Sequence, residues 1–212
     1  MQTYEDGFLR LVRVGPLGPF ANNAYIIADN SSDEAIIVDM PAGSEGLLEA
    51  ARGLRISAIL LTHTHPDHTA DYDLVKAATE APVYCHPAEG FMPAEKIGRP
   101  LADGEEVAVG SLSIRAIHTP GHTPGSICLL VGRYLISGDT LFPGGPGHTR
   151  RPEDIQEIIR SITQRLFILP DDTLVLPGHG DDTTIGRSKR EYAVFASRPH
   201  PADLCGDVSW ES

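Results

Sequence analysis

The 212-residue sequence predicts one α+β domain built from two β-sheets with helices on the outside. Short runs rich in β-branched residues come in two groups, one in each half of the chain, and helical patterns lie between and after them. No linker rich in Pro, Gly or Ser divides the chain, and its length suffices for one full core. We therefore expect a single domain over residues 1–197 and a loop-like C-terminal tail over residues 198–212.

In the first half, the apolar runs are short and end at turn-forming residues, as strands do. Ser44 precedes a helical pattern and is expected to cap that helix. The run 58–61 is apolar throughout, which predicts a buried strand. The expected strands are 8–14, 24–28, 35–38, 58–61 and 82–85, and the expected helices are 45–52 and 69–80.

The second half has the same style. Pro152 suits the first position of a helix, and the isoleucines that follow it recur at helical spacing on one face. The expected strands are 106–109, 112–117, 126–131, 134–137 and 173–176, and the expected helices are 152–166 and 184–196.

Composition limits the classes of function. A formal net charge of −12 argues against a nucleic-acid partner, because phosphate binding requires clustered Lys and Arg. The three cysteines are scattered and form no C-x-x-C pair, so we expect no disulfide framework, as in a reducing cytoplasm. Residues 1–6 are acidic and polar rather than a signal peptide, and no run reaches transmembrane length. We expect a cytoplasmic monomer or homodimer acting on a small molecule, with no membrane partner.

The segment that follows the apolar run 58–61 is rich in metal-ligand side chains. It contains His63, His65, Asp67 and His68 within six residues. Because His63 and His65 are two apart, they project to the same side at the end of a strand. Asp67 and His68 are adjacent and point in different directions, so one segment can serve two neighbouring ions. Imidazole and carboxylate ligands suit zinc, iron or manganese and leave positions open to water.

Three more ligand-type residues stand just after expected strands: His122, Asp139 and His179. Gly or Pro beside each one permits a sharp turn that aims the side chain back over the strand ends. Such positions on a rigid sheet hold a site accurately.

Four motifs now stand in order: Thr-His-Thr-His-Pro-Asp-His, Gly-His-Thr-Pro-Gly-Ser, Ser-Gly-Asp-Thr-Leu-Phe and Pro-Gly-His-Gly. Together they resemble the metallo-β-lactamase fold superfamily, and within it the hydroxyacylglutathione hydrolase (glyoxalase II) branch. The resemblance covers nearly the whole chain. It implies a four-layer αββα sandwich of two mixed β-sheets with outer helices.

The resemblance also implies roles for individual residues. One divalent ion would be bound by His63, His65 and His122, and a second by Asp67, His68 and His179. Asp139 would bridge the two ions, and Asp39 would brace the metal-binding loop. Zinc is the expected metal, with iron or manganese as alternatives. Asp67 and Asp139 would be catalytic, because they would orient a hydroxide held between the ions.

The remaining polar candidates lie outside this ligand set. His118 is expected to support the site rather than bind metal. His86 is expected to be structural and His200 to be solvated. His148, in the glycine-rich loop after Asp139, is a candidate for contact with the substrate, and so is Arg150, which could hold an acidic group.

The expected activity is hydrolysis of a small thioester by a two-metal centre, because a thiolate can leave without a dedicated general acid. Gly-Gly-Pro-Gly-His at 144–148 departs from the glyoxalase II pattern, and we expect these 212 residues to be too few for the helical domain that grips glutathione in longer members. Another low-molecular-weight thiol is therefore an alternative. Further alternatives are a mononuclear iron persulfide dioxygenase that uses His63, His122 and Asp139, a lactonase or β-lactamase, and a non-enzymatic metal-binding module. The acidic balance disfavours a ribonuclease.

Overall fold

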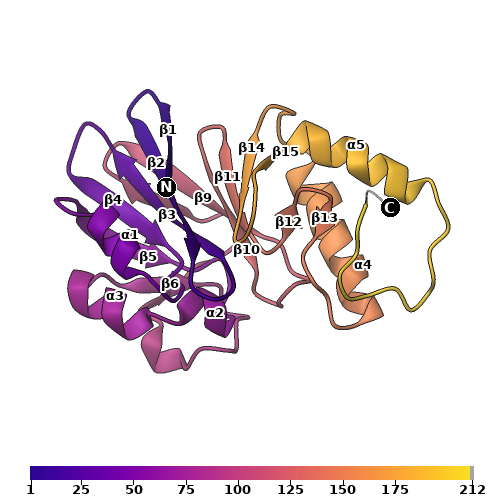
Figure 1. Cartoon of the computed structure of the whole chain (residues 1–212), viewed down its shortest axis with the longest axis horizontal. Coiled ribbons are helices and arrows are strands. Elements are labelled where there is room, and N and C mark those ends of the chain that lie inside the picture. The colour runs from indigo at the N-terminus through magenta and orange to yellow at the C-terminus, as the bar shows by residue number, and fades with distance from the viewer. Residues whose placement is uncertain (211–212) are drawn as a thin grey trace.

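The computed structural model describes residues 1–210 and has four layers, helix–sheet–sheet–helix. Figure 1 shows the first half of the chain forming one outer helical layer and one sheet, with the second half forming the other sheet and helical layer. The predicted α+β sandwich of two mixed sheets is confirmed.

The first sheet has seven strands in sequence order, antiparallel from β1 to β4 and parallel from β4 to β7. Its strands are β1 (Gln2–Asp6), β2 (Leu9–Leu17), β3 (Asn22–Asp29), β4 (Glu34–Val38), β5 (Arg55–Leu60), β6 (Val83–Cys85) and β7 (Arg99–Pro100). Its helices are α1 (Glu45–Ala50), α2 (Pro66–Thr69), α3 (Tyr72–Thr79) and a short 3₁₀ turn, Ala94–Lys96.

The second sheet has six strands in the order β15-β14-β11-β10-β9-β8, and only β11 and β14 run parallel. Its strands are β8 (Glu106–Val109), β9 (Leu112–His118), β10 (Ile127–Val131), β11 (Tyr134–Gly138), β14 (Leu174–Pro177) and β15 (Thr183–Thr184). A separate hairpin pairs β12 (Leu141–Phe142) with β13 (Gly145–Pro146), and the helices are α4 (Pro152–Ser161), which continues as a π-helical turn, Ile162–Leu166, and α5 (Ile185–Ala196).

Side-chain alternation divides the core into three apolar clusters. On β3, Ile27 faces the space between the sheets, whereas its neighbour Ile26 faces the α1 and α3 layer. On the second sheet, Leu129 faces the first sheet and Cys128 packs in the cluster that includes α4 and α5. Both sheets are therefore covered on both faces, which explains why most strands read as continuous apolar runs.

Most expected elements are confirmed, with ends that differ by one to three residues, but three details were wrong. The helix expected at 69–80 begins three residues later, as α3, and a separate short helix, α2, ends at Thr69 before it. Ser44 stands at the start of α1, but its hydroxyl donates to the carbonyl of Pro41 instead of capping the helix. The short strands β1, β7, β12, β13 and β15 were missed, because two to five residues carry too little periodicity.

The chain after α5 packs along the body. Gly206 pairs with Thr149 through two backbone hydrogen bonds, and Trp210 is fully buried. Within residues 1–210, no helix has the length and apolarity needed to cross a membrane.

Candidate metal centre

The predicted ligand residues lie at one edge of the two facing sheets. His63 follows β5, and His122, Asp139 and His179 follow β9, β11 and β14 respectively. His68 lies in α2. The structure therefore brings together seven residues from four separate segments of the chain, which are His63, His65, Asp67, His68, His122, Asp139 and His179.

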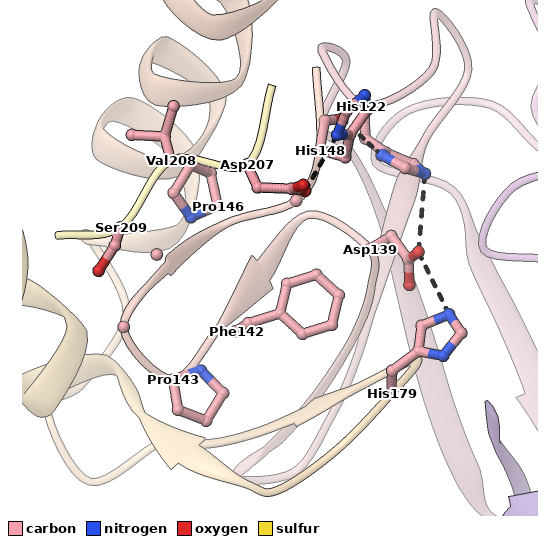
Figure 2. A pocket seen from close by; sticks show the side chains of 13 residues that line it. His122, Asp139, Phe142, Pro143, Pro146, His148, His179, Asp207, Val208 and Ser209 are labelled. Carbon is pink, nitrogen blue, oxygen red and sulfur yellow. Dashed lines mark hydrogen bonds and ion pairs between the residues drawn. The ribbon is translucent and has the colours of Figure 1, made fainter. Parts of the chain in front are cut away.

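These residues form three overlapping groups whose ligand atoms all lie within 4.8 Å of one another. The first group is His63, His65 and His122, and the third is Asp67, His68 and His179. The second group, His63, His68 and Asp139, joins the other two. Asp139 lies between them, with Oδ2 3.6 Å from His122 Nε2 and 3.5 Å from His179 Nε2 (Figure 2).

Hydrogen bonds on the far side of the imidazole rings orient three of these histidines. Nδ1–H of His122 donates to the carbonyl of His148 at 2.8 Å, and Nδ1–H of His179 donates to the carbonyl of Phe20 at 2.9 Å. His68 donates from Nδ1 to Asp39 at 2.9 Å. Each ring therefore turns its Nε2 toward the centre, and loss of any proton from that nitrogen leaves the tautomer that a metal requires.

The unpaired atoms also fit divalent metal ions. Among the described residues, His63 Nε2 and Asp139 Oδ1 are buried and have no hydrogen-bond partner. His122 Nε2 and His65 Nδ1 face each other at 2.9 Å, and so do His68 Nε2 and His179 Nε2 at 3.3 Å. A buried polar atom without a partner is costly, and ring nitrogens that converge in pairs can all turn lone pairs inward only when a cation lies between them. A divalent cation at the centre would satisfy these atoms.

Electrostatics divide the histidines into two classes. Burial lowers the pKa of His65 to about 4, with a further contribution from His122, and burial lowers the pKa of His63 well below its ordinary value. Burial also disfavours the charged form of His179, but hydrogen bonds to Asp139 and Asp67 outweigh it and raise its pKa to about 10. His63 and His65 are thus ready to bind a cation at neutral pH, whereas His179 must first release a proton.

Asp39 lies in the position that the resemblance predicted for a brace. Its carboxylate is buried and accepts from the amide and hydroxyl of Thr62, both at 2.8 Å, as well as from His68. Asp39 therefore connects the segment just after β5 to the ring of His68 through hydrogen bonds. It belongs to none of the three groups of ligand atoms found among the described residues.

Glu89 clamps two ligand-bearing loops together, and sequence reasoning missed it. One carboxylate oxygen accepts from the amide of Thr64 at 2.8 Å and from its hydroxyl at 2.6 Å. The other oxygen accepts from the amide of Gly125 at 3.0 Å and from the hydroxyl of Thr123. Thr64 lies between His63 and His65, and Thr123 directly follows His122. Glu89 itself lies in a loop without a recognisable motif, so no pattern in the sequence indicates its role.

Asn22 is a second residue that the sequence did not single out. Its Nδ2 donates to Asp67 Oδ2 at 2.9 Å and lies 3.4 Å from His179 Nε2. Asn22 begins β3, in the other sheet from His179, so this contact spans the edge of the sandwich.

Gly178 lies so close to two candidate ligands that its position leaves no room for a side chain. A Cβ on Gly178 would lie 2.4 Å from Asp139 Oδ1 and 2.6 Å from His68 Cε1. Both distances are far shorter than real contacts allow, so a side chain there would displace the Asp139 carboxylate or the His68 ring.

Two pockets open beside the centre. The first, ≈ 500 Å³, is lined by His122, Asp139 and His179 together with His148 and the loop around it (Figure 2). The second, ≈ 590 Å³, shares His122 and is lined by Phe91 and Arg150, with the Arg150 guanidinium 5.6 Å from the Phe91 ring. Both predicted substrate-contact candidates, His148 and Arg150, therefore lie in pockets that touch the ligand residues.

The other histidines lie outside the centre. His118 Nε2 donates to the carbonyl of Pro124, in the loop that carries His122, and the His118 ring stacks on His86 at 3.9 Å. His200 is exposed, as expected, although its ring also stacks on Phe195 at 3.7 Å.

Comparison with known proteins gives the family. A model of the metallo-beta-lactamase superfamily matches residues 17–179. An uncharacterized protein of Aquifex aeolicus (strain VF5) is 36% identical over 205 residues, covering 88% of this chain and 97% of the relative. A hydroxyacylglutathione hydrolase of Aeromonas hydrophila is 37% identical over 179 residues, covering 83% of this chain and 68% of the relative.

A solved structure gives the same result. The crystal structure of BLEG-1 B3 metallo-beta-lactamase has a TM-score of 0.76 and 31% identity, covering 85% of this chain and 96% of that one. The fold, the histidine and aspartate cluster and these matches agree. The chain belongs to the metallo-beta-lactamase superfamily and is a metal-dependent hydrolase.

Proposed function

We propose that the protein hydrolyses a small thioester at a centre of two divalent ions, most simply zinc. The observation that carries this proposal is the pair of ligand groups, His63–His65–His122 and Asp67–His68–His179, with Asp139 between them. The similarity to hydroxyacylglutathione hydrolases supports a thioester as the substrate class.

Two ions held there would supply a hydroxide nucleophile at neutral pH and a Lewis acid for the acyl oxygen. The chain's own groups would do the rest. Asp67, held by Asn22, and Asp139 would accept the proton of the nucleophile and orient its lone pair toward the acyl carbon. The substrate would lie in the first pocket, against Phe142 and His148.

The leaving group favours a thioester over an amide. A thiolate, with a pKa near ~8.5, departs without protonation, whereas an amine requires a general acid. Within residues 1–210, the lining of the first pocket contains no Lys, Tyr or Glu that could serve as this acid. Besides the candidate metal ligands, the described lining of this pocket has two titratable side chains, His148 and Asp207.

Elemental analysis of freshly purified protein, followed by a substrate panel, tests the proposal. We expect two divalent ions per chain and thioester turnover that a chelator abolishes and added metal restores. One iron per chain with oxygen uptake on a persulfide would replace the proposal with the dioxygenase alternative. Nitrocefin turnover that matches thioester turnover would favour a β-lactamase, a comparison worth making because of the similarity to BLEG-1.

A further inference from the structure

The end of the chain forms part of the first pocket. Asp207, Val208 and Ser209 line it together with the ligand residues His122 and Asp139. Figure 2 shows these three residues across the glycine-rich loop, on the opposite side of Phe142 from His179. We call residues 206–210 the C-terminal wall.

The C-terminal wall is attached at both ends. At one end, Gly206 and Thr149 exchange backbone hydrogen bonds of 3.1 and 2.8 Å. At the other end, the amide of Trp210 donates to the carbonyl of Gly144 at 2.7 Å. The Trp210 ring is fully buried against three aromatic residues of the second half, with ring centroids 5.2–6.3 Å away, which are Phe167, Tyr192 and Phe195.

The charge at the rim of the C-terminal wall is negative. Asp207 lies at the rim with its side chain 91% exposed, and His148 Nδ1 lies 3.0 Å from its carboxylate. Among the described residues that line this pocket there is no Lys or Arg. The second pocket carries both signs, because Arg150 and Arg151 line it together with Glu153, Asp154 and Glu157. Arg151 is paired with Asp154, whereas Arg150 lies over the Phe91 ring and forms no ion pair among the described residues. Arg150 is therefore the cation of the second pocket that is open to an anionic group.

We propose that the C-terminal wall selects the substrate: the portion bound at the outer end of the first pocket, away from the metal centre, carries no negative charge, because an anionic group there would face Asp207 with no Lys or Arg in the described lining. Any anionic group of the substrate is directed to the second pocket, beside Arg150. This inference rests on the proposed function only in taking the metal centre as the place where the substrate reacts.

A pair of ligands that differ by one carboxylate tests the selection without turnover. Propionate and succinate share a carboxylate that can bind the metal centre, and succinate adds a second carboxylate. The ratio of their dissociation constants is measured by calorimetry on the metal-loaded protein. The variant is Asp207→Lys. The matched control is Asp203→Lys, an equal charge change at an exposed residue of the same tail outside the pocket lining.

We expect Asp207→Lys to shift the ratio toward succinate by roughly three- to tenfold, the effect of reversing one charge several ångström away in water. Asp203→Lys should shift it by less than about twofold, because solvent screens a more distant charge. An equal ratio in all three proteins would overturn the proposal. A ratio that responds to Arg150→Gln but not to Asp207→Lys would also overturn it, because Arg150 alone would then place the second carboxylate and Asp207 would exclude nothing from the first pocket.

The failure of the proposed function gives a different result. A protein that hydrolyses no thioester, yet shows the Asp207-dependent ratio, would lose the proposed activity and keep the selective wall. A protein that hydrolyses thioesters with an unchanged ratio would keep the activity and lose the wall.

Discussion

Removal of the Glu89 carboxylate should lower the metal affinity of the centre and the stability of the protein, although Glu89 is not one of the seven candidate ligands. Glu89→Ala deletes the acceptor of four hydrogen bonds, two from backbone amides and two from hydroxyls. The hydroxyls can turn elsewhere, since Thr123 also lies 2.7 Å from Ser126 Oγ. The amides of Thr64 and Gly125 cannot turn.

The magnitude follows from those two amides. A buried amide left without a partner costs about 1–3 kcal/mol, so two cost about 2–6 kcal/mol. Glu89 is only half-buried, and water entering its place would recover part of this cost. We therefore expect a loss of about 2–3 kcal/mol in the free energy of unfolding. Metal affinity should fall about 10–100-fold, as it does when partners behind metal ligands are removed.

Urea unfolding and competitive zinc titration measure the two effects. Glu95→Ala is the matched control, because Glu95 is exposed nearby and its carboxylate accepts no hydrogen bond from the residues that the structure describes. Glu89→Gln should recover part of the metal affinity, since its oxygen can still accept from one loop. If Glu89→Ala binds zinc as tightly as the parent protein, Glu89 does not position the ligand loops.

Three further predictions concern Asp139 between the two metal ions, His148 in the first pocket, and the loss of stability at low pH. Asp139→Ala should lower metal content and hydrolysis together, and full occupancy by two metals would show that Asp139 does not bridge. His148→Ala should change kcat or KM with the metal content intact, whereas unaltered kinetics would place it outside the site. Asp29 accepts hydrogen bonds from Ser31 and Ser111, which hold its pKa below the ordinary 3.8. Its stabilising effect is therefore present above about pH 4 and lost at lower pH, so the difference in thermal midpoint between the parent protein and Asp29→Asn should shrink from pH 6 to pH 3. A constant difference would refute this.

Local patterns in the sequence determined the two groups of strands, the helices α4 and α5, and the seven candidate ligands. These features are readable because strand alternation, helical spacing and the positions after strands are set over a few residues. The end of β5 is an example, since a single apolar run predicts both the strand and where His63 projects.

Only the tertiary structure decided which distant residues serve the centre. Glu89 meets Gly125 across 36 positions of the chain, and Asn22 meets Asp67 across 45. The C-terminal tail read as a loop, yet Asp207 lines the first pocket with Asp139. No short-range pattern encodes such contacts, because they arise where two sheets and their loops close on one another. The sequence alone thus identified a metal-binding motif, and the packing of remote segments around it determined how the candidate ligands are held and which charges line the two pockets beside them.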